Sequence, residues 1–325
     1  MKNIEVSIII PLYNEEKYID GCIESLTNQS YPREKMEWIL VDGNSTDKTK
    51  TIIENYMVQK QYPIILLDNK ERKTPYALNM GIKIAKGKYI IRLDAHASFS
   101  SNYIEKCVYY LEKMDVENVG GIAETTANTF CGRAISHMLS TKFGVGGSDF
   151  RVGEGNKYVD TVPFGAFKRE VFDTVGLFNT KLLRSEDNDM NARIRENGGK
   201  IWLAEDIRFK YYCRDTISGI LKMGLQNGNA LFYTLKENRK AMSVRHFIPF
   251  LFVVSLLLLP ISSILCPPIK YVFGIELLLY LVLDFYYSFF SGKAQYGMIN
   301  VWLYPAFHIS YGMGSLLGFF GARFY

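Results

Sequence analysis

The chain contains 325 residues, of which 48% are hydrophobic and 22% are charged, and its formal net charge is +5. This composition excludes an intrinsically disordered protein, and the small net charge does not indicate nucleic-acid binding. Only five charged side chains lie beyond residue 245. The sequence therefore predicts a soluble N-terminal part followed by a membrane part.

The first 125 residues alternate short β-branched runs with amphipathic stretches, which is typical of βαβ units on a mostly parallel sheet. The expected strands cover residues 6–10, 38–41, 64–67 and 89–93, and the expected helices cover residues 15–29, 47–58, 74 onwards and 102–114. The third helix is predicted from Thr74 as the N-cap residue and Pro75 as the first helical residue. An α/β fold is therefore expected for the N-terminal part.

A glycine-rich stretch at residues 144–158 interrupts this pattern. It fits a mobile loop over a site and a plain surface connector equally well. The α/β pattern returns at residues 169–215, and residues 216–245 are expected to form amphipathic surface helices that lead towards a bilayer.

Three apolar segments follow, at residues 247–265, 271–290 and 298–320. Each approaches the ~20 residues that are needed to span a hydrocarbon core of ~30 Å. Three spans would place the C-terminus outside the cell, whereas two spans and a re-entrant or interfacial third segment would place it inside. Glu276 and Asp284 are costly in lipid, so we expect them to face another helix, water or the headgroups. Gly314 and Gly318 are spaced for close helix packing.

The charges and cysteines indicate the compartment of the N-terminal part. Four basic residues precede the apolar region: Lys236, Arg239, Lys240 and Arg245. Positive charge beside a membrane segment favours the cytoplasmic side. The five cysteines are scattered and are predicted to be reduced core residues, and the apolar run at 6–10 is too short for a secretory signal. We therefore expect a multi-pass cell-membrane protein whose N-terminal domain is cytoplasmic.

Several common catalytic motifs are absent from the sequence. A dinucleotide-binding fold needs G-x-G-x-x-G after the first strand, where residues 11–15 read Pro-Leu-Tyr-Asn-Glu. Gly87 and Lys88 precede a strand instead of a helix, which excludes a phosphate-binding P-loop, and neither G-x-S-x-G nor H-E-x-x-H occurs.

Four polar clusters remain at predicted strand ends, the edge at which open α/β sheets bind ligands. They cover residues 11–15, 41–47, 92–96 and 186–189. Asp94 and His96 point the same way in an extended segment, and their oxygen and nitrogen atoms suit Mn²⁺ or Mg²⁺ bridging a diphosphate. Asp42 can accept a hydrogen bond from a base or a ribose, although a capped turn is equally expected there. The last cluster can also be an acidic first turn that complements the helix dipole.

Seven ordered segments carry a resemblance to a known family. They are SIIIPLYNEE at 7–16, VDGNSTDKT at 41–49, TPYALNMGIKIAKGKYIIRLDAHA at 74–97, VGG at 119–121, FGVGGSDFR at 143–151, VDTVPFGAFKREVFDTVGLFN at 159–179 and EDNDMNARIRENGGKI at 186–201. Over residues 4–230 the chain resembles family 2 glycosyltransferases with the GT-A fold, and among them the succinoglycan-type glucosyltransferases of exopolysaccharide biosynthesis. The resemblance implies a catalytic domain at 1–215 with a mostly parallel sheet. The charge and hydropathy pattern predicts interfacial amphipathic helices at 216–245 and a membrane domain with two to three apolar segments at 246–325.

The resemblance also assigns site residues by position. Asp187 corresponds to the catalytic base of the family's Glu-Asp pair. Asp94 stands at the first position of the family's metal motif and His96 at its last, which implies a divalent cation, Mn²⁺ or Mg²⁺. The nucleotide-sugar-binding residues that it implies are Pro11, Tyr13, Glu15, Asp42, Lys73, Asn79, Arg92, Asp94 and Glu186, with the uridine held by Tyr13, Glu15 and Asp42.

One motif of the family is missing. Processive polymer synthases carry Q-x-x-R-W, whereas residues 224–228 read Gly-Leu-Gln-Asn-Gly. This departure argues against a long-chain synthase and leaves the acceptor contacts open, with Arg214 as a candidate for the missing charge.

The implied function is the inverting transfer of a sugar from a UDP-sugar, in this subgroup UDP-glucose, to a lipid-linked saccharide in polysaccharide or glycoconjugate assembly. The alternatives are a transferase acting directly on a polyprenyl phosphate and a catalytically silent membrane scaffold. Membrane lipid is an expected partner and nucleic acid is not. Association of copies through the membrane segments stays open.

Overall fold

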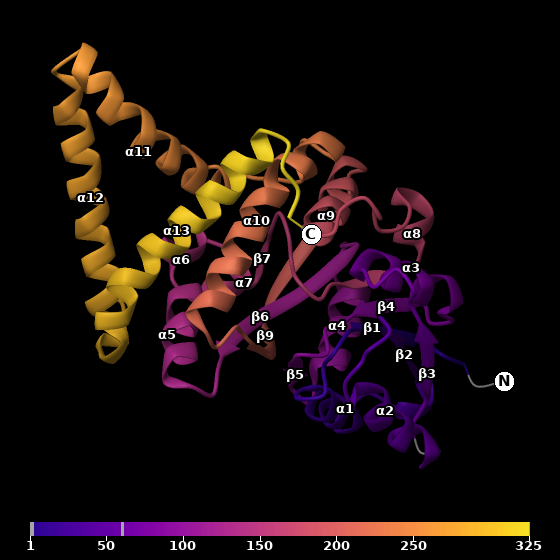
Figure 1. Cartoon of the computed structure of the whole chain (residues 1–325). Coiled ribbons are helices and arrows are strands. Elements are labelled where there is room, and N and C mark those ends of the chain that lie inside the picture. The colour runs from indigo at the N-terminus through magenta and orange to yellow at the C-terminus, as the bar shows by residue number, and fades with distance from the viewer. Residues whose placement is uncertain (1–2, 60–61, 325) are drawn as a thin grey trace. The chain divides into compact units, whose positions relative to one another are not determined.

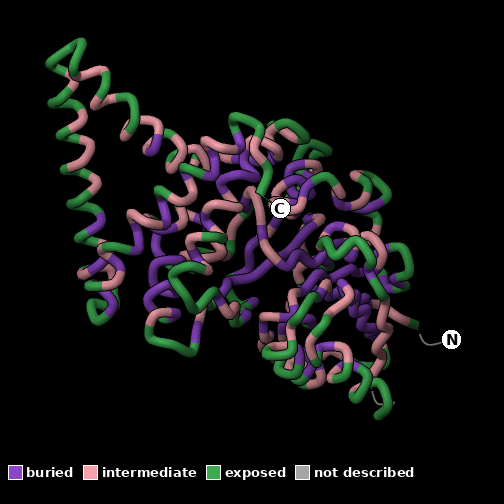
Figure 2. Tube along the Cα trace, viewed as in Figure 1, coloured by how far each residue is buried: buried purple, intermediate pink, exposed green. Residues whose placement is uncertain are grey.

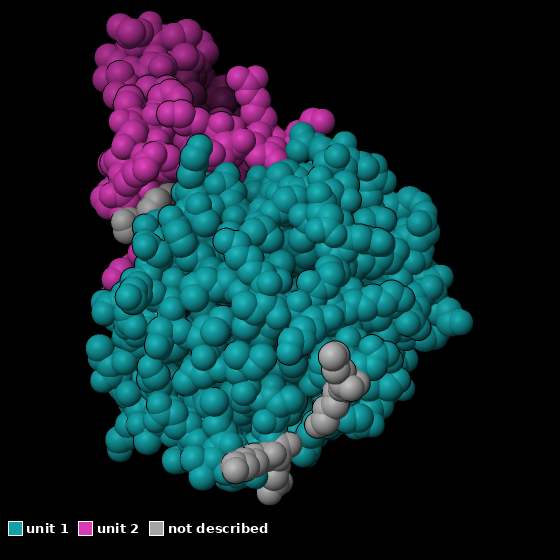
Figure 3. All heavy atoms as spheres, turned by 90° about the vertical axis from the view of Figure 1, so that its right-hand side faces the viewer, with its two compact units in different colours: residues 1–124, 153–211 teal, residues 125–152, 212–325 magenta. Residues whose placement is uncertain are grey.

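The computed structural model describes residues 3–59 and 62–324 (Figure 1). The chain divides into two compact units, of which the first contains residues 1–124 and 153–211 and the second contains residues 125–152 and 212–325 (Figure 3). Residues 125–152 thus group with the C-terminal part of the chain. The domain limits at 215 and 245 stay predictions.

The first unit is built on a sheet, and the described residues place nine strands in it. These are β1 (Val6–Leu12), β2 (Met36–Asp42), β3 (Ile64–Asp68), β4 (Tyr89–Arg92), β5 (Ala97–Phe99), β6 (Asn118–Thr126), β7 (Lys157–Tyr158), β8 (Ala166–Lys168) and β9 (Ile201–Tyr212). Their order is β3-β2-β1-β4-β8-β6-β9-β5, with β7 paired to β9. The first four strands are parallel, and β8, β5 and β7 join antiparallel to their neighbours. The predicted α/β fold is confirmed.

The helices of the first unit connect these strands. They are α1 (Ile19–Thr27), α2 (Thr49–Val58), α3 (Thr74–Ile84), α4 (Tyr103–Lys113), α8 (Glu170–Val175) and α9 (Glu186–Glu196), with a 3-10 turn at Arg33–Lys35. Helix α1 begins later than predicted, because Asn14 has φ 56° and the Glu15 N–H donates to Thr49 Oγ1 at 2.8 Å. The predicted cap of α3 is wrong by one residue, since Lys73 is the N-cap residue and Thr74 is already helical.

The core of the first unit lies along β1 and β2, where almost every residue is buried (Figure 2). Such runs are typical of parallel strands that are covered on both faces. Helix α3 lies close against β1, because a Cβ atom on Gly81 would be 2.5 Å from Cγ2 of Ile9. A larger residue than glycine at position 81 would therefore push α3 away from β1.

The second unit is helical. Its elements are α5 (Phe130–Leu139), α6 (Lys142–Val145), α7 (Asp149–Val152), α10 (Ile217–Glu237), α11 (Ile248–Leu265), α12 (Ile269–Phe289) and α13 (Gly297–Phe319), with 3-10 turns at Val244–His246 and Ala294–Tyr296. The glycine-rich stretch at 144–158 contains parts of α6, α7 and β7, so it is not one long loop. Cys266 is exposed at the turn between α11 and α12, which corrects its predicted place in a core.

Two helices among the described residues are long and apolar enough to span a membrane. They cover Val244–Leu265 and Ile269–Phe289, with mean hydropathies of 2.5 and 1.6. Most of their side chains are exposed or half-buried (Figure 2). Glu276 in α12 accepts a hydrogen bond from Ser255 in α11 at 2.5 Å, and Asp284 is 1% exposed. Glu276 thus faces a neighbouring helix, as predicted, and Asp284 is buried.

The third apolar segment forms α13, which packs along α10. A Cβ atom on Gly314 would lie 2.0 Å from the Leu225 carbonyl oxygen, and one on Gly318 would lie 2.5 Å from that of Asn229. The Asn229 amide also donates to the Ala322 carbonyl at 2.8 Å. The predicted role of the two glycines in close helix packing is confirmed.

Candidate active site

The candidate site lies where the parallel strands β1, β2 and β4 end. The loops after β1 and β2 bind each other: the Asn14 N–H donates to Ser45 Oγ at 2.9 Å, and the Thr46 N–H donates to Asn14 Oδ1 at 2.8 Å. Asn14 and Asn44 both have positive φ angles, a strained backbone that is frequent at functional sites. The carboxyl ends of two strands are thus joined into one rigid rim.

Asp42 holds the second of these loops. Its side chain is fully buried, Oδ1 accepts from Ser45 Oγ at 2.5 Å, and Oδ2 accepts from the Ser45 N–H at 3.1 Å. This geometry is that of a capped turn. The contact between Asp42 and a uridine stays a prediction.

Tyr13 and Lys73 lie on exposed parts of the same edge. The Tyr13 ring is 44% exposed, and the Arg72 guanidinium lies 5.8 Å from its centroid. Lys73 is exposed at the start of α3, and Pro11 is half-buried in β1 opposite Val41. Arg72 is not part of any recognised motif, so its contact with the Tyr13 ring was not predicted from the sequence.

Asn79 has a structural partner. Its Nδ2 donates to the Phe178 carbonyl at 2.8 Å, and its Oδ1 accepts from the Phe178 N–H at 2.9 Å. The side chain thereby ties α3 to the segment after α8. Its predicted part in donor binding is untested, and its amide already has these two backbone partners.

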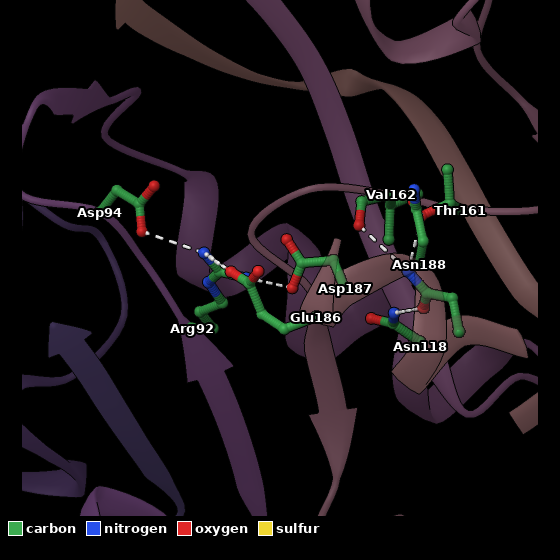
Figure 4. Close-up of polar contacts among 9 residues, drawn as sticks. Arg92, Asp94, Asn118, Thr161, Val162, Glu186, Asp187 and Asn188 are labelled. Carbon is green, nitrogen blue, oxygen red and sulfur yellow. Dashed lines mark hydrogen bonds and ion pairs between the residues drawn. The ribbon is translucent and has the colours of Figure 1, made fainter. Parts of the chain in front are cut away.

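Arg92 forms the centre of a charged cluster with three carboxylates (Figure 4). Its Nη1 contacts Asp187, and its Nη2 lies 3.1 Å from Glu186 Oε1 and 3.4 Å from Asp94 Oδ1. Arg92 is only 6% exposed, and its Nε atom has no hydrogen-bond partner among the described residues. Asp187 is 95 positions away in sequence, so only the fold brings these groups together.

The cluster changes the protonation behaviour of its members. Burial raises the pKa of Asp187 above its usual range; the Arg92 guanidinium opposes this rise, while the charges of Glu186 and Asp94 add to it. Burial by itself lowers the pKa of Arg92, but the three carboxylates outweigh it and raise that pKa. A carboxylate with a raised pKa accepts a proton more readily, which suits a general base.

His96 lies between Glu15 and Tyr211. Its Nδ1 is 3.3 Å from Glu15 Oε1, and its ring meets the Tyr211 ring edge-to-face at 5.3 Å between centroids. Burial lowers the pKa of His96, but the hydrogen bond with Glu15 and the charges of Tyr211 and Asp94 raise it to about 9. Tyr211 was not predicted, since nothing in the pattern of β9 distinguishes it.

The donor set fits a divalent cation only in part. Asp94 and His96 supply one carboxylate and one imidazole, and their side chains are 19% and 28% exposed. Within residues 3–59 and 62–324, no group of three or more His, Cys, Asp or Glu side chains is placed to hold a metal ion. These two side chains fit a cation whose other ligands come from the substrate, not a site closed by protein alone.

The sequence profile of the family named Glycosyl transferase family 2 matches residues 7–176, more than half of the chain. The chain belongs to glycosyltransferase family 2. It is 29% identical over 267 residues to a Methanococcus voltae dolichyl N-acetyl-α-D-glucosaminyl phosphate 3-β-D-2,3-diacetamido-2,3-dideoxy-β-D-glucuronosyltransferase, covering 80% of this chain and 82% of that one. It is 25% identical over 244 residues to the succinoglycan biosynthesis protein ExoA of Rhizobium meliloti, covering 74% and 73%. The predicted resemblance is confirmed.

Two solved glycosyltransferase structures have a fold similar to that of this chain. The mannosyltransferase PcManGT of Pyrobaculum calidifontis, in complex with GDP-Man and Mn²⁺, has a TM-score of 0.68 at 19% identity, covering 96% of this chain and 87% of that one. S. aureus TarS 1-349 in complex with UDP-GlcNAc has a TM-score of 0.54 at 14% identity, covering 99% and 93%. At these identities the likeness shows the fold alone, which is GT-A.

Proposed function

We propose that this glycosyltransferase is a membrane-anchored, inverting enzyme that transfers a sugar, glucose in the first instance, from a UDP-sugar to a lipid-linked saccharide. The single observation that supports it most is the contact of Arg92 with Asp187, Glu186 and Asp94 at the carboxyl end of β4. One relative is named for transfer to a dolichyl N-acetylglucosaminyl phosphate, and another for succinoglycan biosynthesis. Those names favour a saccharide on a lipid over a bare polyprenyl phosphate.

In the proposed reaction, Asp187 removes the proton of the acceptor hydroxyl. The hydroxyl oxygen forms a bond to the anomeric carbon from the face opposite the leaving group, and the bond from that carbon to the diphosphate breaks and releases UDP. An α-linked donor therefore yields a β-linked product. A positioned base contributes about 10²–10⁴-fold. A divalent cation bound at Asp94 and His96 would neutralise charge on the departing diphosphate.

Arg92 has a positioning part in this reaction. It is buried against Asp187, so the carboxylate keeps one orientation while the acceptor approaches. Because three carboxylates face one guanidinium, the cluster keeps a net negative charge, which helps Asp187 to take up a proton.

The membrane part of the proposal is a hairpin of two spans, α11 and α12. The exposed Lys236, Arg239 and Lys240 precede it, which favours a cytoplasmic catalytic domain. Helix α13 packs along α10, and α10 precedes the first span in the sequence. This packing supports two spans and a cytoplasmic C-terminus.

Asp187→Asn tests the chemistry. Transfer, measured as UDP release from UDP-glucose with a lipid-linked saccharide acceptor, should fall by at least ~10²-fold, while UDP-glucose binding measured by calorimetry is retained. Asp173→Asn, an exposed acidic residue in α8, is the matched control and should leave both unchanged. Full turnover by Asp187→Asn, or an α-linked product, would overturn the mechanism.

Labelling with a membrane-impermeant maleimide tests the topology. In a Cys131→Ser background, Cys266 should react in intact cells, because it is exposed at the tip of the hairpin. A cysteine introduced by Phe324→Cys, with Cys266→Ser, should react only after the cells are opened. Reaction of both positions from outside would instead indicate three spans.

A further inference from the structure

We infer that a partly buried chain of hydrogen bonds through Asn118, Asn191, Thr161 and Asn188 positions Asp187 for proton removal. The inference rests on the proposed role of Asp187 as the base. None of the four residues belongs to the charged cluster, and no motif of the sequence pointed to them as a group.

The hydrogen bonds link the four residues in series (Figure 4). Asn118 Nδ2 donates to Asn191 Oδ1 at 2.6 Å, and Asn191 Nδ2 donates to Thr161 Oγ1 at 2.9 Å and to the Val162 carbonyl at 3.3 Å. The Thr161 hydroxyl then donates to Asn188 Oδ1 at 3.1 Å. Asn191 and Thr161 each accept a hydrogen bond from the preceding member and donate one to the next, which determines the orientation of the Asn191 amide.

The last member of the chain adjoins the proposed base. Asn188 follows Asp187 in α9, and Asn191 lies on the next turn of the same helix. The helix starts after Ser185, which has φ 62°, and the Ser185 side chain makes no capping hydrogen bond in the described structure. This first turn thus lacks a side-chain cap from Ser185, and Thr161 supplies a hydrogen bond to it from outside the helix.

The same segment also contacts the strand that carries Arg92. The Arg92 N–H donates to the Gly165 carbonyl at 3.0 Å. A Cβ atom on Gly165 would lie 2.5 Å from Asn118 Oδ1, so a glycine is needed where the segment passes Asn118. Residues 161–165 thus contact Asn188, the neighbour of the proposed base, on one side and the backbone of Arg92 on the other.

Stability alone does not explain these polar groups. Asn118 and Asn191 are 0% and 1% exposed, and Asn118 Oδ1 has no hydrogen-bond partner within the described ranges. Replacing buried polar partners by apolar groups of the same shape is often neutral for folding, while a buried polar atom without a partner is costly. A chain that is kept for the geometry of Asp187 should therefore affect turnover more than folding.

The test is a pair of substitutions at Thr161 in the full-length, detergent-solubilised protein. Thr161→Val keeps the shape and removes the hydroxyl, whereas Thr161→Ser keeps the hydroxyl. We expect Thr161→Val to lower kcat for UDP release from UDP-glucose by roughly 10- to 100-fold, with the KM for UDP-glucose and the affinity for UDP within about twofold of wild type. Thr161→Ser should restore most of kcat.

Two further variants make the outcome decisive. Asn191→Leu keeps a similar volume, adds no charge and removes the amide, so it should lower kcat as Thr161→Val does, and it replaces that variant if the latter does not fold. In the Asp187→Asn background Thr161→Val should cause no further loss, because the positioned group is already gone.

Wild-type kcat in Thr161→Val and Asn191→Leu would overturn the inference. A loss of kcat that occurs only in variants with a lowered Tm, and in proportion to it, would overturn it as well. These results differ from failure of the proposed function. Activity in Asp187→Asn would rule out Asp187 as the base, and with it the proposed function. An inactive Asp187→Asn variant together with wild-type kcat in Thr161→Val would rule out only the positioning role of the hydrogen-bond chain.

Discussion

The interiors of the two units differ: the first unit buries charged and polar groups, whereas the second buries glycines between helices. Arg92 is 6% exposed and contacts three carboxylates, an arrangement that costs desolvation and places reacting groups. Gly228 and Gly314 leave no room for a Cβ atom between α10 and α13, an arrangement that maximises contact between helices. Removal of a buried charge should therefore destabilise the first unit most, whereas a larger side chain in place of a buried glycine should destabilise the second unit most.

Arg92→Met is expected to have the largest effect. It removes the cation from three buried or half-buried carboxylates, so the free energy of unfolding should fall by about 3–5 kcal/mol and transfer should be lost. Arg208→Met is the matched control, because Arg208 pairs with Glu124 on the surface with side chains 47% and 46% exposed. That pair should contribute no more than about 1 kcal/mol. Denaturant unfolding of both variants measures the contrast, and equal losses would contradict it.

Gly228→Ala should have the next largest effect. The new Cβ atom would lie 1.9 Å from the Tyr311 carbonyl oxygen, so α10 and α13 must separate, at a cost of about 1–3 kcal/mol. Gly274→Ala in α12 is the control, since no described atom lies within 4 Å of its Cβ position. Thermal unfolding in detergent should show a lower Tm for Gly228→Ala alone. An unchanged Tm would mean that the two helices are not closely packed.

Asn79→Ala should have a smaller effect, of about 0.5–1.5 kcal/mol on the free energy of unfolding, because the part-buried Phe178 N–H and carbonyl lose their partner. Asn55→Ala, on the exposed face of α2, should stay within about 0.5 kcal/mol of wild type. UDP-glucose binding by calorimetry separates the two roles of Asn79. A large loss of affinity with unchanged stability would favour the predicted donor contact over the structural one.

The sequence predicts the regular elements of the first unit well and their ends less well. Residues 38–41 are all apolar and residues 6–10 are apolar except for Ser7, and the two runs lie inside the observed strands β2 and β1. The start of α1 was missed because the hydrogen bonds of Asn14 and Glu15 go to the neighbouring loop, and the local sequence pattern does not record such a partner.

The sequence also identified the charged motifs without showing how they meet. Asp94, Glu186 and Asp187 were expected at strand and helix ends, and the fold places all three around Arg92. Tyr211 beside His96, and Asn118 beside Asn191, were not expected. Their partners are distant in sequence, so no motif spacing contains them.

By itself, the amino-acid sequence determined the family, the α/β pattern and the acidic residues of the site, because these depend on local periodicity and on short motifs. Tertiary structure decided which side chains meet Arg92, that Asp42 caps its own loop, and that the third apolar segment packs along α10. Hydropathy describes one segment at a time. The partner of a buried charge and the backbone that packs against a glycine are residues distant in sequence. Only the folded chain brings them within contact distance.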